Sequence, residues 1–147
     1  MSVERIPTDT LLQKLLKTTS LNRFFQRYSE DTNSVIEFCE YINKLCTERE
    51  TLPERVIKKS DIERTYGHQL FNGRRSPSRD KVIQLAFGFE MNYDETQKLL
   101  TCARKSTLHP RIKRDAVIIF ALENGLDIEA VQDTLFEFSI SLLGEKK

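Results

Sequence analysis

The fold is decided by residues 52–78, LPERVIKKSDIERTYGHQLFNGRRSPS, whose pattern predicts two short helices, a basic loop and the start of a further helix. At helical spacing, the second of these helices, at about residues 63–72, separates apolar from polar side chains. The apolar side carries Ile62, Tyr66, Leu70 and Phe71, and the polar side carries Arg64, Thr65, His68, Gln69 and Asn72. The apolar side can pack against a core, while nearly every polar side chain can hydrogen-bond to a base edge or a phosphate.

Length and composition favour a small helical protein. A chain of 147 residues with 39% hydrophobic residues can build one compact domain, alone or with helical extensions. Only 5 glycines and 4 prolines are present, which is few for a sheet-rich fold whose turns need such residues. We therefore expect an all-α fold.

Positive charge is concentrated around the polar helix, although the formal net charge of the whole chain is only +1. Residues 53–82 contain eight basic and four acidic side chains, whereas residues 111–147 contain five basic and seven acidic ones. A local excess of positive charge is what contacts to nucleic-acid phosphates need. Taken alone, such an excess more often marks a solvated helix face that has no partner.

The cysteines and the N-terminus predict a reduced, cytoplasmic protein. Cys39, Cys46 and Cys102 are odd in number and form no C-x-x-C pair, so we expect structural thiols. With the isolated His68 and His109 they lack the spacing of a metal site, and we expect no metal and no cofactor. The N-terminus lacks the apolar core of a signal peptide, and no apolar run reaches the roughly 18 residues of a membrane span. We therefore expect no membrane partner.

The chain divides into three predicted parts, an N-terminal helical extension at 1–33, a central domain at 34–104 and a C-terminal helical hairpin at 105–147. In the extension, leucines recur at helical spacing over residues 10–17, and Leu21, Phe24, Phe25 and Tyr28 follow in a second short segment. This extension either docks on the main domain through these apolar side chains or serves as a partner-binding arm.

Capping residues predict where the helices of the central domain begin. Residues 34–37 (SVIE) and 51–54 (TLPE) have the spacing of capping boxes, the latter with a proline in the first turn. Ser76 followed by Pro77 predicts another start, because Ser caps helices and Pro fits their first position. Either Asn92 or Asp94 is expected to cap the next helix.

The second half of the chain contains an internal repeat. RDKVIQLA at residues 79–86 aligns with RDAVIIFA at residues 114–121, a shift of 35 residues that also aligns Gln97 with Gln132. Each copy predicts two helices joined by a tight turn, so the C-terminal copy is expected to be a duplicated helical hairpin. Because the Arg-Asp pair recurs in both copies, we expect structural ion pairs or caps rather than catalytic groups.

An apolar stripe continues from the second copy to near the C-terminus. Its members are Val131, Leu135, Phe138 and Leu142, and the helix that carries them begins after an Asn-Gly-Leu-Asp turn at residues 124–127. The stripe either closes the core or pairs with another subunit.

The motif resembles the lambda repressor-like (XRE) DNA-binding family. The resemblance rests on Val56-Ile57 in the first helix, Arg64-Thr65 early in the second, Leu70-Phe71-Asn72-Gly73 at its end, and Pro77-Ser78. It covers about residues 34–100. The wider sequence, with RRSPSRDKVIQLAFGF at 74–89 and LHPRIKRDAVIIFALENGL at 108–126, resembles bacterial helix-turn-helix proteins that carry an extra C-terminal hairpin.

The resemblance implies a five-helix DNA-binding domain whose third helix enters the major groove, while the first motif helix lies across the backbone. The candidate base contacts are then Arg64, Thr65, His68, Gln69 and Arg75, and the candidate phosphate contacts are Asn72, Arg74, Arg79 and Lys58. Side-chain chemistry agrees, because Arg pairs bidentately with guanine and Gln with adenine, each worth about 1 to 3 kcal/mol of discrimination. As alternatives, Arg64 and Gln69 are ordinary exposed helix residues, and His68 is a solvent-exposed histidine.

Three residues depart from the family pattern. Asp61 occupies a turn position that is often Gly in the family, and Glu63 replaces the usual Ser cap of the third helix. A carboxylate there suits the helix dipole but would repel a nearby phosphate. Gly67 stands where the family usually packs an aliphatic residue, although a mid-helix Gly costs roughly 1 kcal/mol relative to Ala.

These observations predict a sequence-specific DNA-binding transcriptional regulator that reads the major groove with the helix at about 63–72. We expect double-stranded DNA as its partner, a homodimer or a protein partner to supply a second half-site, and a cytoplasmic location associated with the nucleoid. The alternative is a protein-interaction adaptor that kept the helix-turn-helix scaffold and lost or reduced DNA binding. No enzyme is expected, because the sequence carries no paired carboxylates in an apolar setting, no nucleophile elbow and no phosphate-binding loop.

Overall fold

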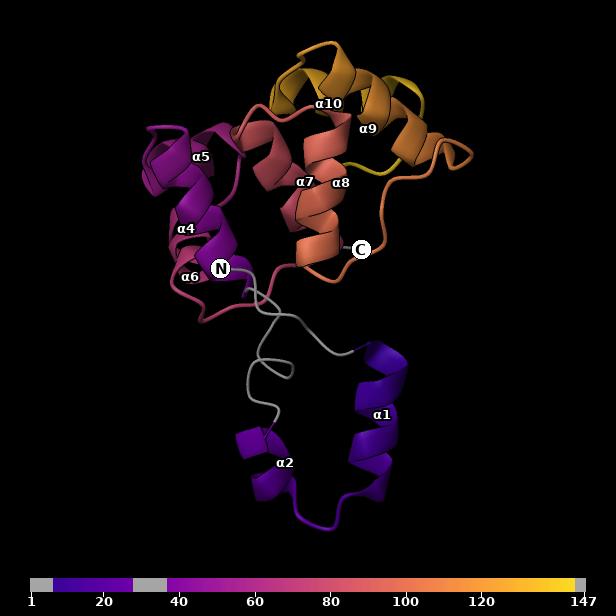
Figure 1. Cartoon of the computed structure of the whole chain (residues 1–147). Coiled ribbons are helices and arrows are strands. Elements are labelled where there is room, and N and C mark those ends of the chain that lie inside the picture. Colours follow the sequence, from indigo (N-terminus) through magenta and orange to yellow (C-terminus); the bar gives the residue numbers. More distant parts are fainter. Residues whose placement is uncertain (1–6, 28–36, 145–147) are drawn as a thin grey trace. The chain divides into compact units, whose positions relative to one another are not determined.

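The computed structural model describes residues 7–27 and 37–144, and throughout these residues the regular secondary structure is helical (Figure 1). The predicted all-α fold is therefore confirmed. The chain forms two compact units, residues 1–36 and residues 37–147. None of the helices within the described ranges has the length and apolar character needed to cross a membrane.

The first unit contains the helices α1 (Thr8–Lys17) and α2 (Leu21–Arg27). No side chain of α1 is buried, and Leu12, Leu15 and Leu16 are exposed, whereas Phe24 of α2 is buried. These are the two short helices that the leucine spacing predicts. Both proposed roles of this extension, docking on the main domain and binding a partner, stay predictions.

The second unit begins with α4 (Phe38–Glu48), α5 (Pro53–Lys59) and α6 (Arg64–Phe71). Proline takes the first position of α5, as expected, but the predicted cap Thr51 is wrong, because Leu52 precedes the helix without a side-chain cap. The helix starts one residue later than a Thr51 cap would place it, since Pro53 fixes the backbone angle of the first turn. The capping box predicted at residues 34–37 begins outside the described residues.

Two helical hairpins complete this unit, α7 (Arg79–Gly88) with α8 (Tyr93–Cys102), and α9 (Lys113–Glu123) with α10 (Ile128–Glu137). The cap of α7 is Ser78, whose hydroxyl accepts from the Lys81 N–H, so the start predicted at Ser76-Pro77 is wrong by two residues. Pro77 is instead buried just before the helix. Asn92 caps α8 in a capping box with Glu95, which decides between the two caps considered.

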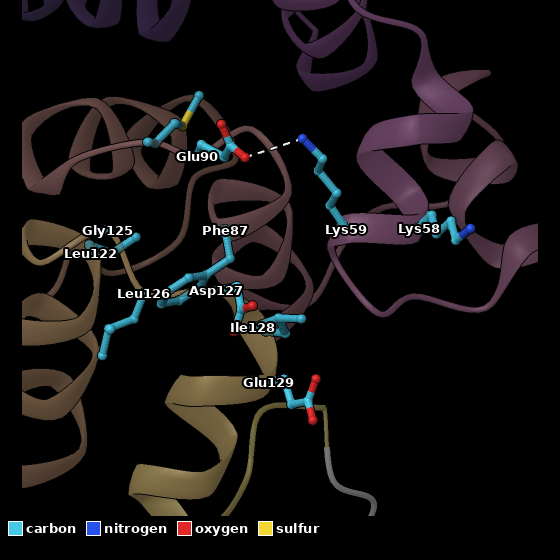
Figure 2. A pocket seen from close by; sticks show the side chains of 11 residues that line it. Lys58, Lys59, Phe87, Glu90, Leu122, Gly125, Leu126, Asp127, Ile128 and Glu129 are labelled. Atoms are coloured by element: carbon cyan, nitrogen blue, oxygen red, sulfur yellow. Dashed lines mark hydrogen bonds and ion pairs between the residues drawn. The ribbon is translucent and has the colours of Figure 1, made fainter.

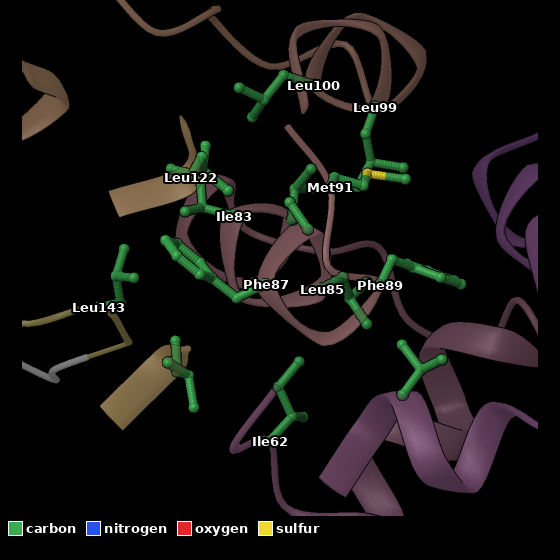
Figure 3. Close-up of a cluster of buried hydrophobic side chains, with 14 of the residues drawn as sticks. Ile62, Ile83, Leu85, Phe87, Phe89, Met91, Leu99, Leu100, Leu122 and Leu143 are labelled. Atoms are coloured by element: carbon green, nitrogen blue, oxygen red, sulfur yellow. The ribbon is translucent and has the colours of Figure 1, made fainter. Parts of the chain in front are cut away.

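Helix α7 is the centre of the second unit, because every residue from Val82 to Gly88 is buried. Its two sides face different neighbours. Figure 3 shows Ile83 and Phe87 beside Leu122 and Leu143 of the C-terminal part, while Ile62 of the α5–α6 connection lies on the other side. Val131 and Leu135 are also buried, so this part of the C-terminal stripe closes the core, whereas Phe138 is exposed. One core thus joins the α4–α6 helices to both hairpins.

The two hairpins are held together by reciprocal ion pairs. The Arg79 guanidinium donates to both carboxylate oxygens of Asp115 at 3.1 and 2.9 Å, and Arg114 donates to both oxygens of Asp80 at 2.8 and 2.9 Å. Each arginine therefore pairs with the aspartate of the other copy. The expected structural ion pairs are confirmed, and they run across the repeat rather than within it.

The loops after the hairpins repeat the same bonds. Arg79 also donates to the carbonyls of Ser106 and Thr107, and Arg114 donates to those of Ser141 and Leu142, each 35 residues further on. Gln97 exchanges two hydrogen bonds with the backbone of Leu108, and Gln132 does the same with Leu143. Because α7 contacts α10 and α8 contacts α9, the hairpins pair reciprocally, in the manner of a two-fold dimer inside one chain.

We predict that Asp115→Asn lowers the free energy of unfolding by about 3 kcal/mol, because it leaves the partly buried Arg79 guanidinium without its charged partner. The Asp115 side chain is only 2% exposed and also accepts from the His109 N–H at 3.0 Å. Urea unfolding followed by circular dichroism measures the change. Asp133→Asn, at an exposed position of α10, is the control and should change stability by less than about 0.5 kcal/mol.

A second prediction concerns how the stability contributed by Asp80 depends on pH. Burial by itself raises the pKa of Asp80, but hydrogen bonds from Arg114 and from the Gly144 N–H outweigh it and hold that pKa below the ordinary value. A depressed pKa stabilises the folded state above the unfolded pKa of about 3.9, and the contribution is lost as pH falls through the folded pKa. The stability difference between wild type and Asp80→Asn should therefore be largest near neutral pH and shrink below about pH 4. A constant difference from pH 7 to pH 2.5 in urea titrations would contradict this account.

Candidate nucleic-acid interface

A tight turn fixes the direction in which α6 leaves α5. Asp61 adopts a left-handed conformation with φ of 56°, which Asp tolerates better than most residues, so it fills the turn position where Gly is common. The buried Gln84 of α7 donates to the carbonyls of Ser60 and Asp61 at 3.1 and 3.3 Å. Helix α7 thereby anchors the turn from inside the core.

Glu63 caps α6. Its carboxylate accepts from the backbone N–H groups of Thr65 at 2.9 Å and Tyr66 at 2.8 Å. Both hydrogen bonds hold the pKa of Glu63 below its ordinary value, and the bond from the Tyr66 N–H has the larger effect. Glu63 is therefore an anion across the neutral range, and it occupies the N–H groups that a helix N-terminus would otherwise offer to a phosphate.

Gly67 allows α6 to approach α5 closely. A Cβ atom at this position would lie 2.5 Å from Cγ2 and 2.7 Å from Cγ1 of Ile57, both well inside contact distance. Gly67 and Ile57 are both buried. The side chain of Ile57 thus occupies the space that a side chain at position 67 would need.

The polar side of α6 faces solvent. Arg64, Thr65 and Asn72 are exposed, and His68 and Gln69 are half-buried, whereas Leu70 and Phe71 are buried. The separation predicted from helical spacing is therefore present. His68 and Asn72 also line an open groove of about 450 Å³ beside the start of α5, together with the exposed Leu52.

A cationic cluster lies at the C-terminal end of this face. Arg75 donates from Nε to the side-chain oxygen of Gln69 at 2.5 Å, and its guanidinium lies 4.9 Å from the centre of the Tyr66 ring. Lys81 Nζ lies 5.5 Å from the same ring. Arg74, which precedes Arg75 in the chain, is exposed. We call Gln69, Arg74, Arg75 and Lys81 with Tyr66 the basic cluster. Cations over an aromatic face are stabilised by about 0.5–2 kcal/mol.

Lys81 is not among the site residues that the sequence predicts. It lies in the first turn of α7, and only the tertiary contact with Tyr66 brings it to α6. Its position in the basic segment around residues 53–82 was a signal for positive charge, but nothing in the spacing assigns it to this face.

Two carboxylates border the N-terminal end of the polar face. Arg64 forms an ion pair with Glu54 of α5 at 3.2 Å, and both side chains are well exposed. Such an exposed pair contributes at most about 1 kcal/mol, so the guanidinium can exchange partners readily. With Glu63, the face is acidic at one end and basic at the other.

Two predicted phosphate contacts lie apart from the others. The Arg79 guanidinium is held by Asp115 and two loop carbonyls, so it serves the fold. Lys58 is exposed on α5 and, with Lys59, borders a cavity of about 550 Å³ between α5 and the two hairpins. Figure 2 shows Lys59 reaching Glu90 across this cavity, with an ion pair of 3.1 Å.

Metal-binding side chains do not gather in the described part of the chain. Within residues 7–27 and 37–144, no group of three or more His, Cys, Asp or Glu side chains could hold a metal ion. Burial raises the pKa of the Cys46 thiol, and it also raises that of Cys102. Comparison with protein-family models, curated proteins and solved structures gives no match to this chain.

We predict that Gly67→Ala destabilises the protein by about 1–2 kcal/mol, because overpacking against Ile57 outweighs the roughly 1 kcal/mol gained in helix propensity. The matched experiment repeats the substitution in an Ile57→Ala background, where the clashing atoms are gone. There the same change should be neutral or stabilising by up to about 1 kcal/mol in urea unfolding. An equal loss in both backgrounds would show that Ile57 is not the cause.

Proposed function

We propose that this chain is a sequence-specific DNA-binding regulator of the helix-turn-helix type that inserts α6 into the major groove. The observation that carries the proposal is the polar face of α6, which displays Arg64, Thr65, His68, Gln69 and Asn72 and runs into the basic cluster. A helix fits the major groove, and these side chains match the donors and acceptors of base edges there. Such a regulator would act in the cytoplasm, on the nucleoid.

The basic cluster supports a division of roles. Arg75 is positioned by Gln69 and by the Tyr66 ring, which reduces the side-chain entropy it would lose on contacting DNA. Its Nη groups remain available for a guanine edge or a phosphate, because the bond to Gln69 uses only Nε. Arg74 and Lys81 add charge at the same end, where the backbone of DNA would pass.

The acidic N-terminal end of α6 would set the orientation of this helix in the major groove. Glu63 repels phosphates from the N-terminus of α6, so phosphate contacts are supplied by the loop after α6 and by α7. Glu54 holds Arg64 beside this end through an exposed ion pair that DNA can replace. Arg64 can then turn toward a guanine without disturbing the core.

The rival function, a protein-interaction adaptor on the same scaffold, is favoured by two observations. Glu54 and Glu63 interrupt the positive surface at the N-terminal end of the polar face, and Leu52 is 64% exposed in the groove beside it. An acidic and apolar border suits a protein partner better than a phosphate backbone.

The two functions are separated by DNA selection from a random library, followed by binding measurements over a salt series. Arg64→Ala combined with Gln69→Ala should lower discrimination between selected and random DNA by about 10- to 100-fold for each lost contact. Arg74→Ala should weaken binding to all sequences and reduce the salt slope by about one.

Arg111→Ala provides the control, because it removes one exposed charge outside the candidate interface and should leave discrimination unchanged. A wild-type protein that enriches no sequence and binds DNA no better than a neutral protein at low salt would exclude DNA binding and leave the adaptor.

A further inference from the structure

The internal repeat places two equivalent helix faces in different surroundings. On α7, one face is covered by the α5–α6 pair. Lys81 lies over the Tyr66 ring, Gln84 donates to the Ser60 carbonyl, and a Cβ on Gly88 would lie 2.0 Å from the Ser60 hydroxyl. Leu85, within the same face, is fully buried.

The equivalent face of α9 is open. A shift of 35 residues takes Lys81 to Ala116, Leu85 to Phe120 and Gly88 to Glu123. Phe120 is 60% exposed, although its counterpart Leu85 has no exposed surface. Figure 1 shows why, since α4–α6 lie against α7 and the α9–α10 hairpin lies on another side of the α7–α8 pair.

We propose that a second copy of this chain covers this open face, so that two chains form a homodimer through α9. We define the α9 face as Lys113, Ala116, Val117, Phe120 and Glu123. Ala116 and Val117 are half-buried and follow Phe120 along one side of the helix. Together the three form an apolar strip that has Lys113 at one end and Glu123 at the other.

The sequence of α9 makes this face complementary to itself. When two copies cross antiparallel about a two-fold axis at Ile118, position 120 of one lies opposite position 116 of the other, and position 113 lies opposite position 123. Phe120 then meets the small Ala116, and the Lys113 ammonium meets the Glu123 carboxylate. Both matches occur twice, because a two-fold contact repeats every pair.

The charges at the two ends favour a second copy over an unrelated partner. A face with lysine at the first helical residue and glutamate at the last is attracted to its own antiparallel image. Phe138, which is 55% exposed and lies 5.8 Å from Lys113 Nζ, extends the apolar surface at the lysine end. The dimer does not depend on DNA, so it stands or falls separately from the proposed function.

The first test is the solution mass of the full chain by sedimentation equilibrium without DNA. Wild type should have twice the chain mass of 17.2 kDa, with a Kd below about 10 µM. Phe120→Glu should have the mass of one chain. Phe136→Glu is the matched control and should remain a dimer, because Phe136 is 75% exposed on α10 and, two residues from Phe138, belongs to a different face at helical spacing.

The second test exchanges the charges. Lys113→Glu and Glu123→Lys should each weaken dimerisation at least tenfold, and the double variant should restore it to within about threefold of wild type. Glu123 also accepts from the Tyr93 N–H at 2.8 Å. Glu123→Lys removes this hydrogen bond, and thermal unfolding measures how much stability is lost with it. Lys113→Glu cannot repair a lost bond to Tyr93, so restoration of the dimer identifies the intermolecular pair.

A wild-type monomer at 100 µM would overturn the proposal, as would a dimer that survives Phe120→Glu or a double variant no better than the singles. If Phe120→Glu does not fold, the charge exchange decides alone. Failure to bind DNA by a protein that dimerises as described would overturn only the proposed function.

Discussion

Two guanidinium–carboxylate pairs, Arg79 with Asp115 and Arg114 with Asp80, are the interaction on which the arrangement of the second unit depends. Each arginine also donates to two loop carbonyls, so the pairs are tied to the loops as well as to each other and are largely withdrawn from solvent. The pairs specify that each hairpin lies against the other copy. They also fix the N-terminus of α7, and the position of α7 governs everything that packs on it.

Helix α7 in turn fixes the position of the helices that carry the candidate interface. Gln84 holds the turn between α5 and α6, and the absence of a side chain at Gly88 lets α7 touch the α5 backbone. Gly67 brings α6 equally close to Ile57. Side chains that are to contact a ligand at fixed geometry need a backbone held in this way, since a flexible support would cost binding energy. The polar face of α6 thus stands on two close-packed helix contacts.

Local patterns in the sequence were enough to predict the helices, the polar face of α6 and the repeat, because these depend on spacing along one element. The start of α7 was misplaced, since Ser76 and Ser78 both flank Pro77 and only packing buries the proline outside the helix. The exchange of partners between the Arg-Asp pairs, the need for Gly67 and the approach of Lys81 to Tyr66 all arise between elements. No spacing along a single helix encodes them.

The two copies of the repeat have stayed alike where their contacts are alike and differ where their contacts differ. The Arg-Asp pairs and Gln97 with Gln132 make the same bonds in both copies. Gly88, which the close approach of α5 requires, corresponds to Glu123, whose side chain would exclude a helix docked in the same way. The α9 face therefore cannot be a vacant copy of the α5 binding surface, and any chain that covers it must cross α9 in a different geometry.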